Sequence, residues 1–124
     1  MIVAAHAASS AATAVAKEGC NTTSCNERVA RKACSQTRVV SCIKRASLHW
    51  RVSFSMLLRK ARCECGLDPY AVGFGVHRGL FQFNWPGTWA TTPYGRRDVF
   101  SAKWNSLAAA WMHNMGRGGE WACQ

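Results

Sequence analysis

The sequence predicts a mainly α fold, α+β with minimal strand. Two segments, 53–65 and 101–115, repeat apolar residues at three- and four-residue spacing behind a serine that can cap a helix. Gly66 and Gly116 follow these segments and can end both helices. The stretch between them is interrupted by glycine and proline, so any strands there are expected to be short.

The composition predicts one packed domain. A chain of 124 residues leaves little room for a second independent core. A hydrophobic share of 48%, with six Trp, five Phe and two Tyr, is enough to build a core and argues against disorder. The formal net charge of +10 favours polyanionic partners such as nucleic acid, anionic lipid or phosphate-bearing wall polymers. Charge alone does not choose among them, and we interpret the basic residues first as a solvated face.

Residues 1–18 are interpreted as an Ala-rich tail or leader remnant. They have no basic n-region of the kind that opens a secretory signal, and their apolar stretch is too short to cross a bilayer. No other segment has the length and hydropathy of a transmembrane helix. An exported protein with this sequence would use a weak leader or another route.

Residues 19–45 are predicted to form a basic, cysteine-rich arm. The chain has seven cysteines and no C-x-x-C pair, which favours disulfides in an oxidising compartment over a zinc site. We therefore expect no metal and no cofactor. Four cysteines fall in the arm and allow three pairings, between which the sequence does not decide: Cys20, Cys25, Cys34 and Cys42. The odd total leaves one thiol over.

The remaining elements follow in chain order. Short helical patterns cover about 27–34 and then 39–52. The segment 67–79 is expected to be a loop or hairpin, and Trp-Pro-Gly at 85–87 breaks the short apolar run before it. The last helix, 102–115, should place one set of residues on its apolar side: Trp104, Leu107, Ala108, Trp111 and Met115.

Glu64 is the candidate catalytic residue. The chain has only six acidic residues, and Glu64 alone falls on the apolar face of a predicted helix, in its last turn. The helix C-terminus and partial burial both disfavour the ionised carboxylate, and a protonated carboxyl is what cleavage of a glycosidic bond requires. The alternative is a structural ion pair with Lys60 or Arg62.

Four motifs then resemble one enzyme family. They are Arg-Cys-Glu-Cys-Gly-Leu-Asp-Pro at 62–69, Gly-Leu-Phe-Gln-Phe at 79–83, Gly-Thr-Trp at 87–89 and Glu-Trp-Ala-Cys at 120–123. In this order they resemble the lysozyme-like lytic transglycosylases, especially small actinobacterial and phage-associated forms related to resuscitation-promoting factors. The resemblance covers residues 46–124, which it implies are a lysozyme-like domain with a cleft, preceded by the disulfide-bonded arm.

The resemblance implies a role for each matching residue. Glu64 matches the single catalytic glutamate, and four residues would bind substrate: Gln82, Phe83, Thr88 and Trp89. An amide such as that of Gln82 can donate to and accept from sugar hydroxyls and N-acetyl groups. The alternative for Gln82 is that it is only a surface residue between two core phenylalanines. Trp89 can have both roles, with one part of its ring packed in the core and another part forming a platform for a sugar.

The cysteines near Glu64 also match the family in part. Cys63 and Cys123 resemble the disulfide that joins the catalytic helix to the C-terminal tail. Cys65 stands where the family usually has serine, and it is the natural candidate for the leftover thiol. A nucleophilic role is not expected for it, because no histidine is near it in sequence.

One catalytic carboxylate favours a lytic transglycosylase over a two-acid glycosidase. Asp68 precedes Pro69 and is expected to cap a turn, and Asp98 is expected to cap or to form an ion pair. The implied substrate is the glycan strand of peptidoglycan, with anionic wall polymers as a further partner and nucleic acid not expected. The protein would act outside the cell, in the wall, or on a phage particle. The oligomeric state is left open.

Two other functions compete with this one. A wall-binding or virion structural protein would keep the fold without turnover, although the retained Glu64 argues against it. A cationic membrane-active protein would fit the charge of +10 and the six Trp, but it would leave the ordered motifs unexplained.

Overall fold

The computed structural model describes residues 27–123, with side chains from residue 36 on. The chain divides into two units, Met1–Arg38 and Val39–Gln124, and the second contains the hydrophobic core. Residues 1–18, together with Cys20 and Cys25 and the side chain of Cys34, lie outside this description.

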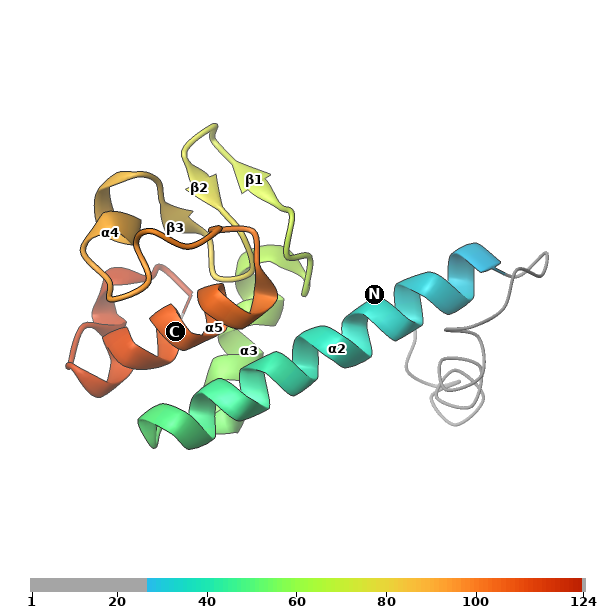
Figure 1. Cartoon of the computed structure of the whole chain (residues 1–124), viewed down its shortest axis with the longest axis horizontal. Helices are drawn as coiled ribbons and strands as arrows, with labels where there is room; N and C mark the ends of the chain where they lie inside the picture. The colour runs from blue at the N-terminus through green and yellow to red at the C-terminus, as the bar shows by residue number, and fades with distance from the viewer. Residues whose placement is uncertain (1–26, 124) are drawn as a thin grey trace. The chain divides into compact units, whose positions relative to one another are not determined.

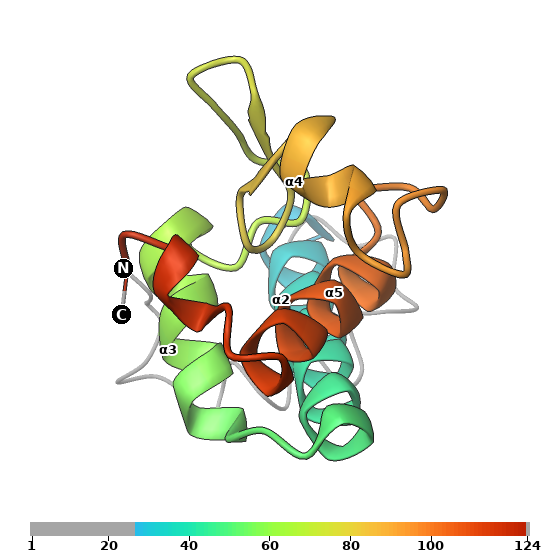
Figure 2. The ribbon, with the colours of Figure 1, turned by 90° about the vertical axis from the view of Figure 1, so that its left-hand side faces the viewer.

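The described part is mainly helical with one small sheet, as predicted. Its elements in chain order are α2 (Glu27–Trp50), α3 (Phe54–Cys65), β1 (Val72–Gly73), β2 (His77–Arg78), β3 (Phe83–Asn84), α4 (Gly87–Ala90), α5 (Ala102–Asn114) and the 3-10 helix η1 (Gly118–Glu120). In the second unit, α3 and α5 lie under the sheet and α4 (Figures 1 and 2). None of the helices described here combines the length and hydropathy that a membrane crossing requires.

The prediction of two short helices before Ser53 was wrong. One continuous helix, α2, covers Glu27–Trp50. No glycine or proline occurs within it, so nothing in the backbone ends the first helical pattern before the second begins. The predicted boundary at 45/46 falls inside α2, whose Val39 and Ile43 are buried in the core.

The predicted caps of α3 and α5 are present. The Ser53 hydroxyl accepts a hydrogen bond from the Met56 backbone N–H at 3.2 Å, and the backbone N–H of Gly66 closes α3 at φ 63° by donating to Arg62 O. The Ser101 hydroxyl accepts from Trp104 N at 3.3 Å. Each satisfies a backbone group that a helix end leaves without an internal partner.

The apolar side of α5 differs from the prediction. Its buried face contains Asn105, Ala108, Ala109 and Met112, whereas Met115 is 57% exposed. The cause is Asn105, which lies in the core with both ends of its amide paired: Oδ1 accepts from Phe81 N at 2.8 Å and Nδ2 donates to Val99 O at 2.7 Å. A buried amide with its hydrogen bonds satisfied fixes which side of the helix faces inward.

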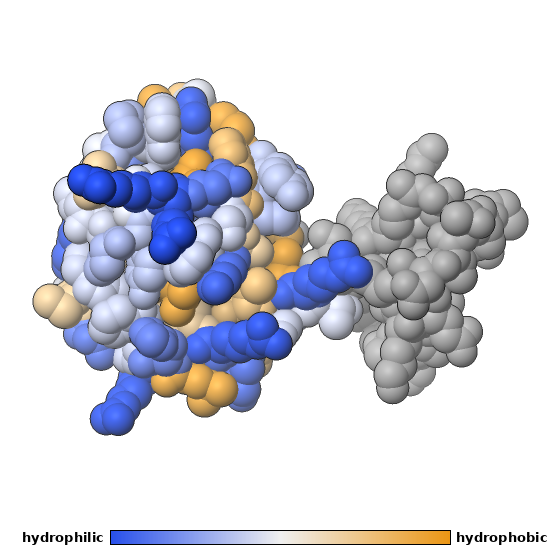
Figure 3. All heavy atoms as spheres, in the orientation of Figure 1, coloured by the Kyte–Doolittle hydropathy of each residue, from blue (hydrophilic) through white to orange (hydrophobic). Residues whose placement is uncertain are grey.

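The segment predicted as a loop or hairpin is an antiparallel hairpin. Val72 pairs with Arg78, and Arg78 pairs in turn with Phe83 on β3. The hairpin region carries most of the exposed large hydrophobic residues of the described chain: Tyr70, Val72, Phe74, Val76 and Trp85. Orange side chains around it are visible in Figure 3.

The core joins all the main elements of the second unit. Its buried hydrophobic members are Val39, Ile43, Ala46, Leu57, Ala61, Leu80, Phe81, Phe83, Trp89, Val99, Ala108, Ala109, Ala110, Met112 and Trp121. The 79–83 motif thus contributes three core residues and runs through the centre of the unit. Its position is therefore fixed by burial on the order of 2 kcal/mol per large side chain.

Candidate functional site

Glu64 lies in the last turn of α3 and is half-buried. Its Oε2 accepts a hydrogen bond from the backbone N–H of Cys123 at 3.3 Å. The neighbouring Cys63 forms a disulfide with Cys123 across a Cα–Cα distance of 6.0 Å, which is the pair that the resemblance implied. The carboxylate is thus held against the C-terminal tail by one hydrogen bond, with a covalent bond one residue away.

Cys65 anchors the end of α3 to the 79–83 motif. Its thiol donates to Leu80 O at 2.9 Å and also lies 3.5 Å from Ala61 O. Burial raises the pKa of the Cys65 thiol to about 11, so it is a neutral thiol near pH 7. It acts as a small hydrogen-bond donor in place of a hydroxyl, and a thiolate nucleophile is not available.

Cys42 corrects the predicted disulfide framework. It was expected to pair within the arm, but its thiol is free, and burial raises its pKa. Cys42 and Cys65 are therefore both free, where the sequence predicted one leftover thiol. Cys42 belongs to the second unit, where it lies in α2 beside the buried Ile43.

Gln82 uses its amide nitrogen to hold the hairpin. Nε2 donates to Gly79 O at 2.9 Å and to Ala71 O at 3.1 Å. A Cβ at Gly73 would come within 2.5 Å of Gln82 Oε1, so the hairpin backbone packs directly on this amide. Gln82 has φ 49°, a left-handed conformation that costs a non-glycine residue energy and that these contacts stabilise.

A small cavity of about 80 Å³ gathers three of the four predicted substrate residues, Gln82, Phe83 and Thr88. The sequence did not single out His77, Asn84 and Met112, which also line it. The other two lining residues, Glu120 and Trp121, belong to the last motif but were given no role at a cavity. Its volume is far below the roughly 300–1,000 Å³ of typical ligand sites. In this conformation it has room for a small chemical group but not for a whole sugar ring. Glu64 is not part of this lining.

Trp89 belongs to the core and does not line the cavity. Its side chain is 1% exposed, and its Nε1 donates to Arg97 O at 3.2 Å. Its ring meets that of Phe83 edge-to-face, with the ring centroids 5.2 Å apart. A ring with no exposed face cannot stack on a sugar. Of its two predicted roles, the structure shows the core role.

Glu120 is the acidic group at the cavity. Both oxygens of its carboxylate accept hydrogen bonds from Arg117, at 2.6 and 3.2 Å, and these bonds lower the pKa of Glu120. It is therefore ionised near neutral pH. The other two candidate acids cap turns, as predicted: Asp68 accepts from Tyr70 N, and Asp98 accepts from Phe100 N, each at 2.9 Å.

A buried lysine lies one helical turn before Glu64. Lys60 is 1% exposed, and its ammonium lies 3.0 Å from His113 Nε2 and 3.1 Å from Gly118 O. The same ammonium is 4.7 Å from the centre of the Trp121 ring. Burial lowers the pKa of Lys60, and the charge of Glu64 opposes that shift. The sequence pattern put Lys60 on the apolar face but gave no sign of these partners.

His113 and Trp121 complete this buried cluster. The two rings stack in parallel, with centroids 5.2 Å apart. Because an ammonium can only donate, His113 Nε2 must accept, and the ring is neutral. Burial and the Lys60 charge lower the pKa of His113 to about 4. A Cβ at Gly118 would collide with the His113 ring, so this packing requires glycine there.

No protein-family model, curated protein or solved structure matches this chain. Among the side chains that the structure describes, those of residues 36–123, no group of three or more His, Cys, Asp or Glu is placed to share a metal ion.

Proposed function

We propose that this chain is a lysozyme-like enzyme that cleaves the glycan strands of peptidoglycan, with Glu64 as its general acid and base. The observation that carries the proposal is that all four motif segments meet in space. Cys65 contacts Leu80, Trp121 donates to Phe81 O at 2.6 Å, and the Cys63–Cys123 disulfide joins the first motif to the last.

The third motif joins the same assembly through Trp89, whose ring packs on Phe83. Segments up to 60 residues apart are thus joined by a continuous chain of contacts. Chance similarity of short motifs does not require them to be neighbours, so their contact supports the resemblance to lysozyme-like lytic transglycosylases. The same argument supports a lysozyme-like fold for the second unit.

In the proposed reaction, the Glu64 carboxyl gives its proton to the oxygen of the β-1,4 bond between N-acetylmuramic acid and N-acetylglucosamine. The bond from C1 to that oxygen breaks, and the leaving sugar departs with a hydroxyl. The Glu64 carboxylate then accepts the proton of the muramic acid C6 hydroxyl as its oxygen bonds to C1. The product is a 1,6-anhydro sugar. A water in place of that hydroxyl gives a reducing end, the muramidase outcome.

One alternative is a non-catalytic wall-binding or virion structural protein, and two observations support it. The cavity of about 80 Å³ does not admit a sugar ring, and Gln82 Nε2 already has two acceptors inside the protein. For an active enzyme, this cavity must therefore widen, and open toward Glu64, when a strand binds. In either case we propose action in the wall, after secretion or on a phage particle.

The test compares wild type with Glu64→Gln on purified peptidoglycan, with the products read by mass spectrometry. Asp98→Asn is the matched control, because Asp98 is exposed and Asn keeps the oxygen that accepts from Phe100 N. We expect anhydro-muropeptides from wild type and the control, and a loss of about 100-fold or more in Glu64→Gln.

Reducing ends in place of anhydro products would make the protein a muramidase. Equal cleavage by wild type and Glu64→Gln would remove Glu64 from the mechanism. No cleavage by wild type, with retained binding to peptidoglycan, would favour the non-catalytic alternative.

A further inference from the structure

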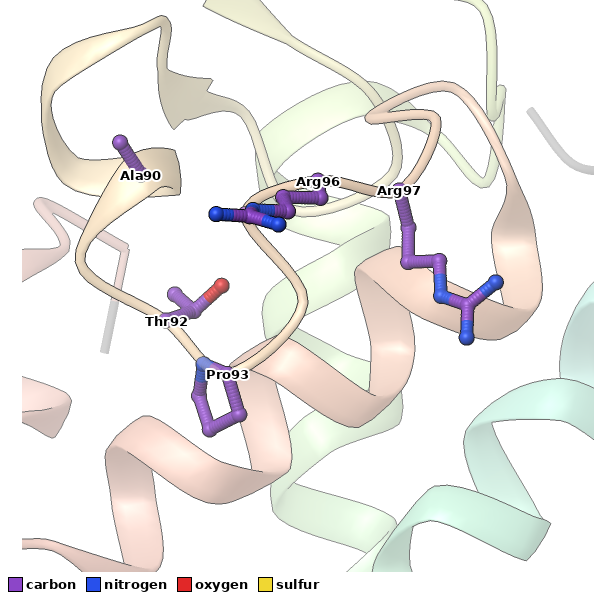
Figure 4. Close-up of a pocket in the computed structure, with 6 residues that line it drawn as sticks. Ala90, Thr92, Pro93, Arg96 and Arg97 are labelled. Atoms are coloured by element: carbon purple, nitrogen blue, oxygen red, sulfur yellow. The ribbon is translucent and has the colours of Figure 1, made fainter.

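A second, larger hollow lies beyond α4, on the loop that leads to α5. It measures about 610 Å³ and is open to solvent, and it is lined by Ala90, Thr92, Pro93, Gly95, Arg96 and Arg97. Figure 4 shows the loop curving around it, with the Arg96 side chain reaching across toward Ala90. None of the six lining residues is acidic.

The loop around the hollow is built as a rigid rim. The buried Thr92 hydroxyl donates to Trp89 O at 2.9 Å, and Thr92 Oγ1 also accepts from Tyr94 N. A Cβ at Gly95 would lie 2.9 Å from Ala90 Cα, so only glycine lets the two sides of the loop close on each other. The hollow is therefore present before any ligand arrives, and binding does not need to order the loop.

The cations at this rim have no acidic partner. The Arg97 guanidinium and the Lys103 ammonium both lie over the Trp104 ring, 4.5 and 4.4 Å from its centre. Among the described residues, no carboxylate forms an ion pair with Arg96, Arg97 or Lys103. Figure 3 shows dark blue side chains across the same face. Like charges held together without a counterion repel each other, and an anion relieves that repulsion.

The geometry points to a binding site for the phosphate diester of a polyol phosphate wall polymer. The Arg96 guanidinium reaches across the hollow, and its parallel N–H donors suit the oxygens of a phosphate. The Arg97 guanidinium is turned away toward Trp104 and adds positive charge beside the hollow. The hollow has room for one phosphate with its flanking polyol, whereas a nucleic acid duplex needs a longer positive track. Our choice of a wall polymer, though not of a phosphate, rests on the proposed function.

The position of the hollow fits a polymer attached to a glycan strand. Ala90 lines the hollow and Thr88, two residues earlier in the same helix, lines the small cavity. The two sites therefore lie two residues apart along α4 and, because residues i and i+2 of a helix do not face each other, on different sides of it. A glycan bound beside the cavity can carry a flexible phosphate branch around this one-turn helix to the basic hollow.

The experiment measures binding of a short synthetic glycerol phosphate oligomer by calorimetry, using the full chain. Arg96→Gln with Arg97→Gln should weaken binding by at least about tenfold, because the charge-assisted contact of Arg96 and the nearby charge of Arg97 are both lost. Lys44→Gln with Arg45→Gln, on the exposed side of α2, removes the same charge and should change affinity by less than about threefold. Arg96→Lys with Arg97→Lys keeps the charge and should restore binding only in part.

Equal weakening by both glutamine pairs would overturn the site and leave only general charge attraction. Tighter binding of a DNA duplex matched in total charge would also overturn it, in favour of a nucleic-acid surface. Thermal melting checks that each variant is folded. The oligomer contains no glycosidic bond, so its binding does not depend on Glu64, and either proposal can fail while the other stands.

Discussion

Lys60 and Arg96 are both cations, but the structure surrounds them in opposite ways. The Lys60 ammonium is buried against an imidazole nitrogen, a carbonyl oxygen and an indole ring. Arg96 is exposed at the rim of an open hollow and has no acidic partner among the described residues. Both count equally toward the net charge of +10.

The difference shows that the net charge of a chain does not say which of its cations stabilise the fold and which are available to bind a ligand. A buried cation with its donors satisfied contributes to the packing between helices, and no ligand can reach it. An exposed cation without a partner contributes little to stability and is available for binding. The two regions should therefore respond to different changes, and three predictions test this separation.

The largest change in the free energy of unfolding is expected when the Cys63–Cys123 disulfide, beside the buried cluster, is removed. Replacing Cys63 and Cys123 together by serine should lower the free energy of unfolding by about 4 kcal/mol, because the bond closes a loop with a sequence separation of 60. Urea unfolding measures this change. Affinity for the glycerol phosphate oligomer should stay the same, and a parallel loss of affinity would show that the two regions are coupled.

Removal of the buried cation should come next. Lys60→Ala leaves His113 Nε2 and Gly118 O without their donor and opens a void, which should cost about 3 kcal/mol. Arg96→Ala is the matched control, and its free energy of unfolding should stay within about 0.5 kcal/mol of wild type. Equal destabilisation by both variants, in urea at pH 7, would contradict the distinction between them.

The smallest expected effect is a pH dependence of the free energy of unfolding that comes from His113. Its pKa is about 4 in the folded chain, below the 6.5 of an unperturbed imidazole. The unfolded chain therefore binds the proton first as pH falls, so this contribution is present above pH 6.5 and is lost toward pH 4. Because the ring is partly exposed, solvent screening reduces it to about 1 kcal/mol.

His113→Gln should remove that contribution. Unfolding free energies at pH 7 and pH 4.5 should differ less for this variant than for wild type, since glutamine can accept from Lys60 but does not titrate. Other acidic groups titrate in both proteins and cancel in the comparison. An unchanged difference would mean that His113 is not held neutral by the cluster.

The sequence predicted the parts of the fold that depend on local chemistry. Serine caps, the glycine that ends α3 and the turn-capping aspartates act within a few residues, so each can be inferred from its neighbours. The continuity of α2 was missed because the pattern fades between 34 and 39, although no helix-breaking residue lies there. The absence of a breaker was the better signal.

The candidate site was predicted less completely, because its contacts are long-range. The burial of Lys60 depends on His113 and Gly118, which are more than 50 residues away, and lysine is rarely buried. The place of Glu120 at the cavity depends on the path of the tail after α5. Trp89 matched a motif, but only the three-dimensional packing shows that its ring has no exposed face.

Trp121 gives the small cavity one stiff wall. Its ring stacks on that of His113 and meets the Phe83 ring edge-to-face, with the two centroids 5.5 Å apart. Its indole N–H donates a hydrogen bond to Phe81 O. Three other lining residues, His77, Phe83 and Asn84, come from strands of only two residues each. A short ladder opens at far lower energy than a packed core. Any ligand that enlarges this space must therefore bend the hairpin outward while the tail stays in place.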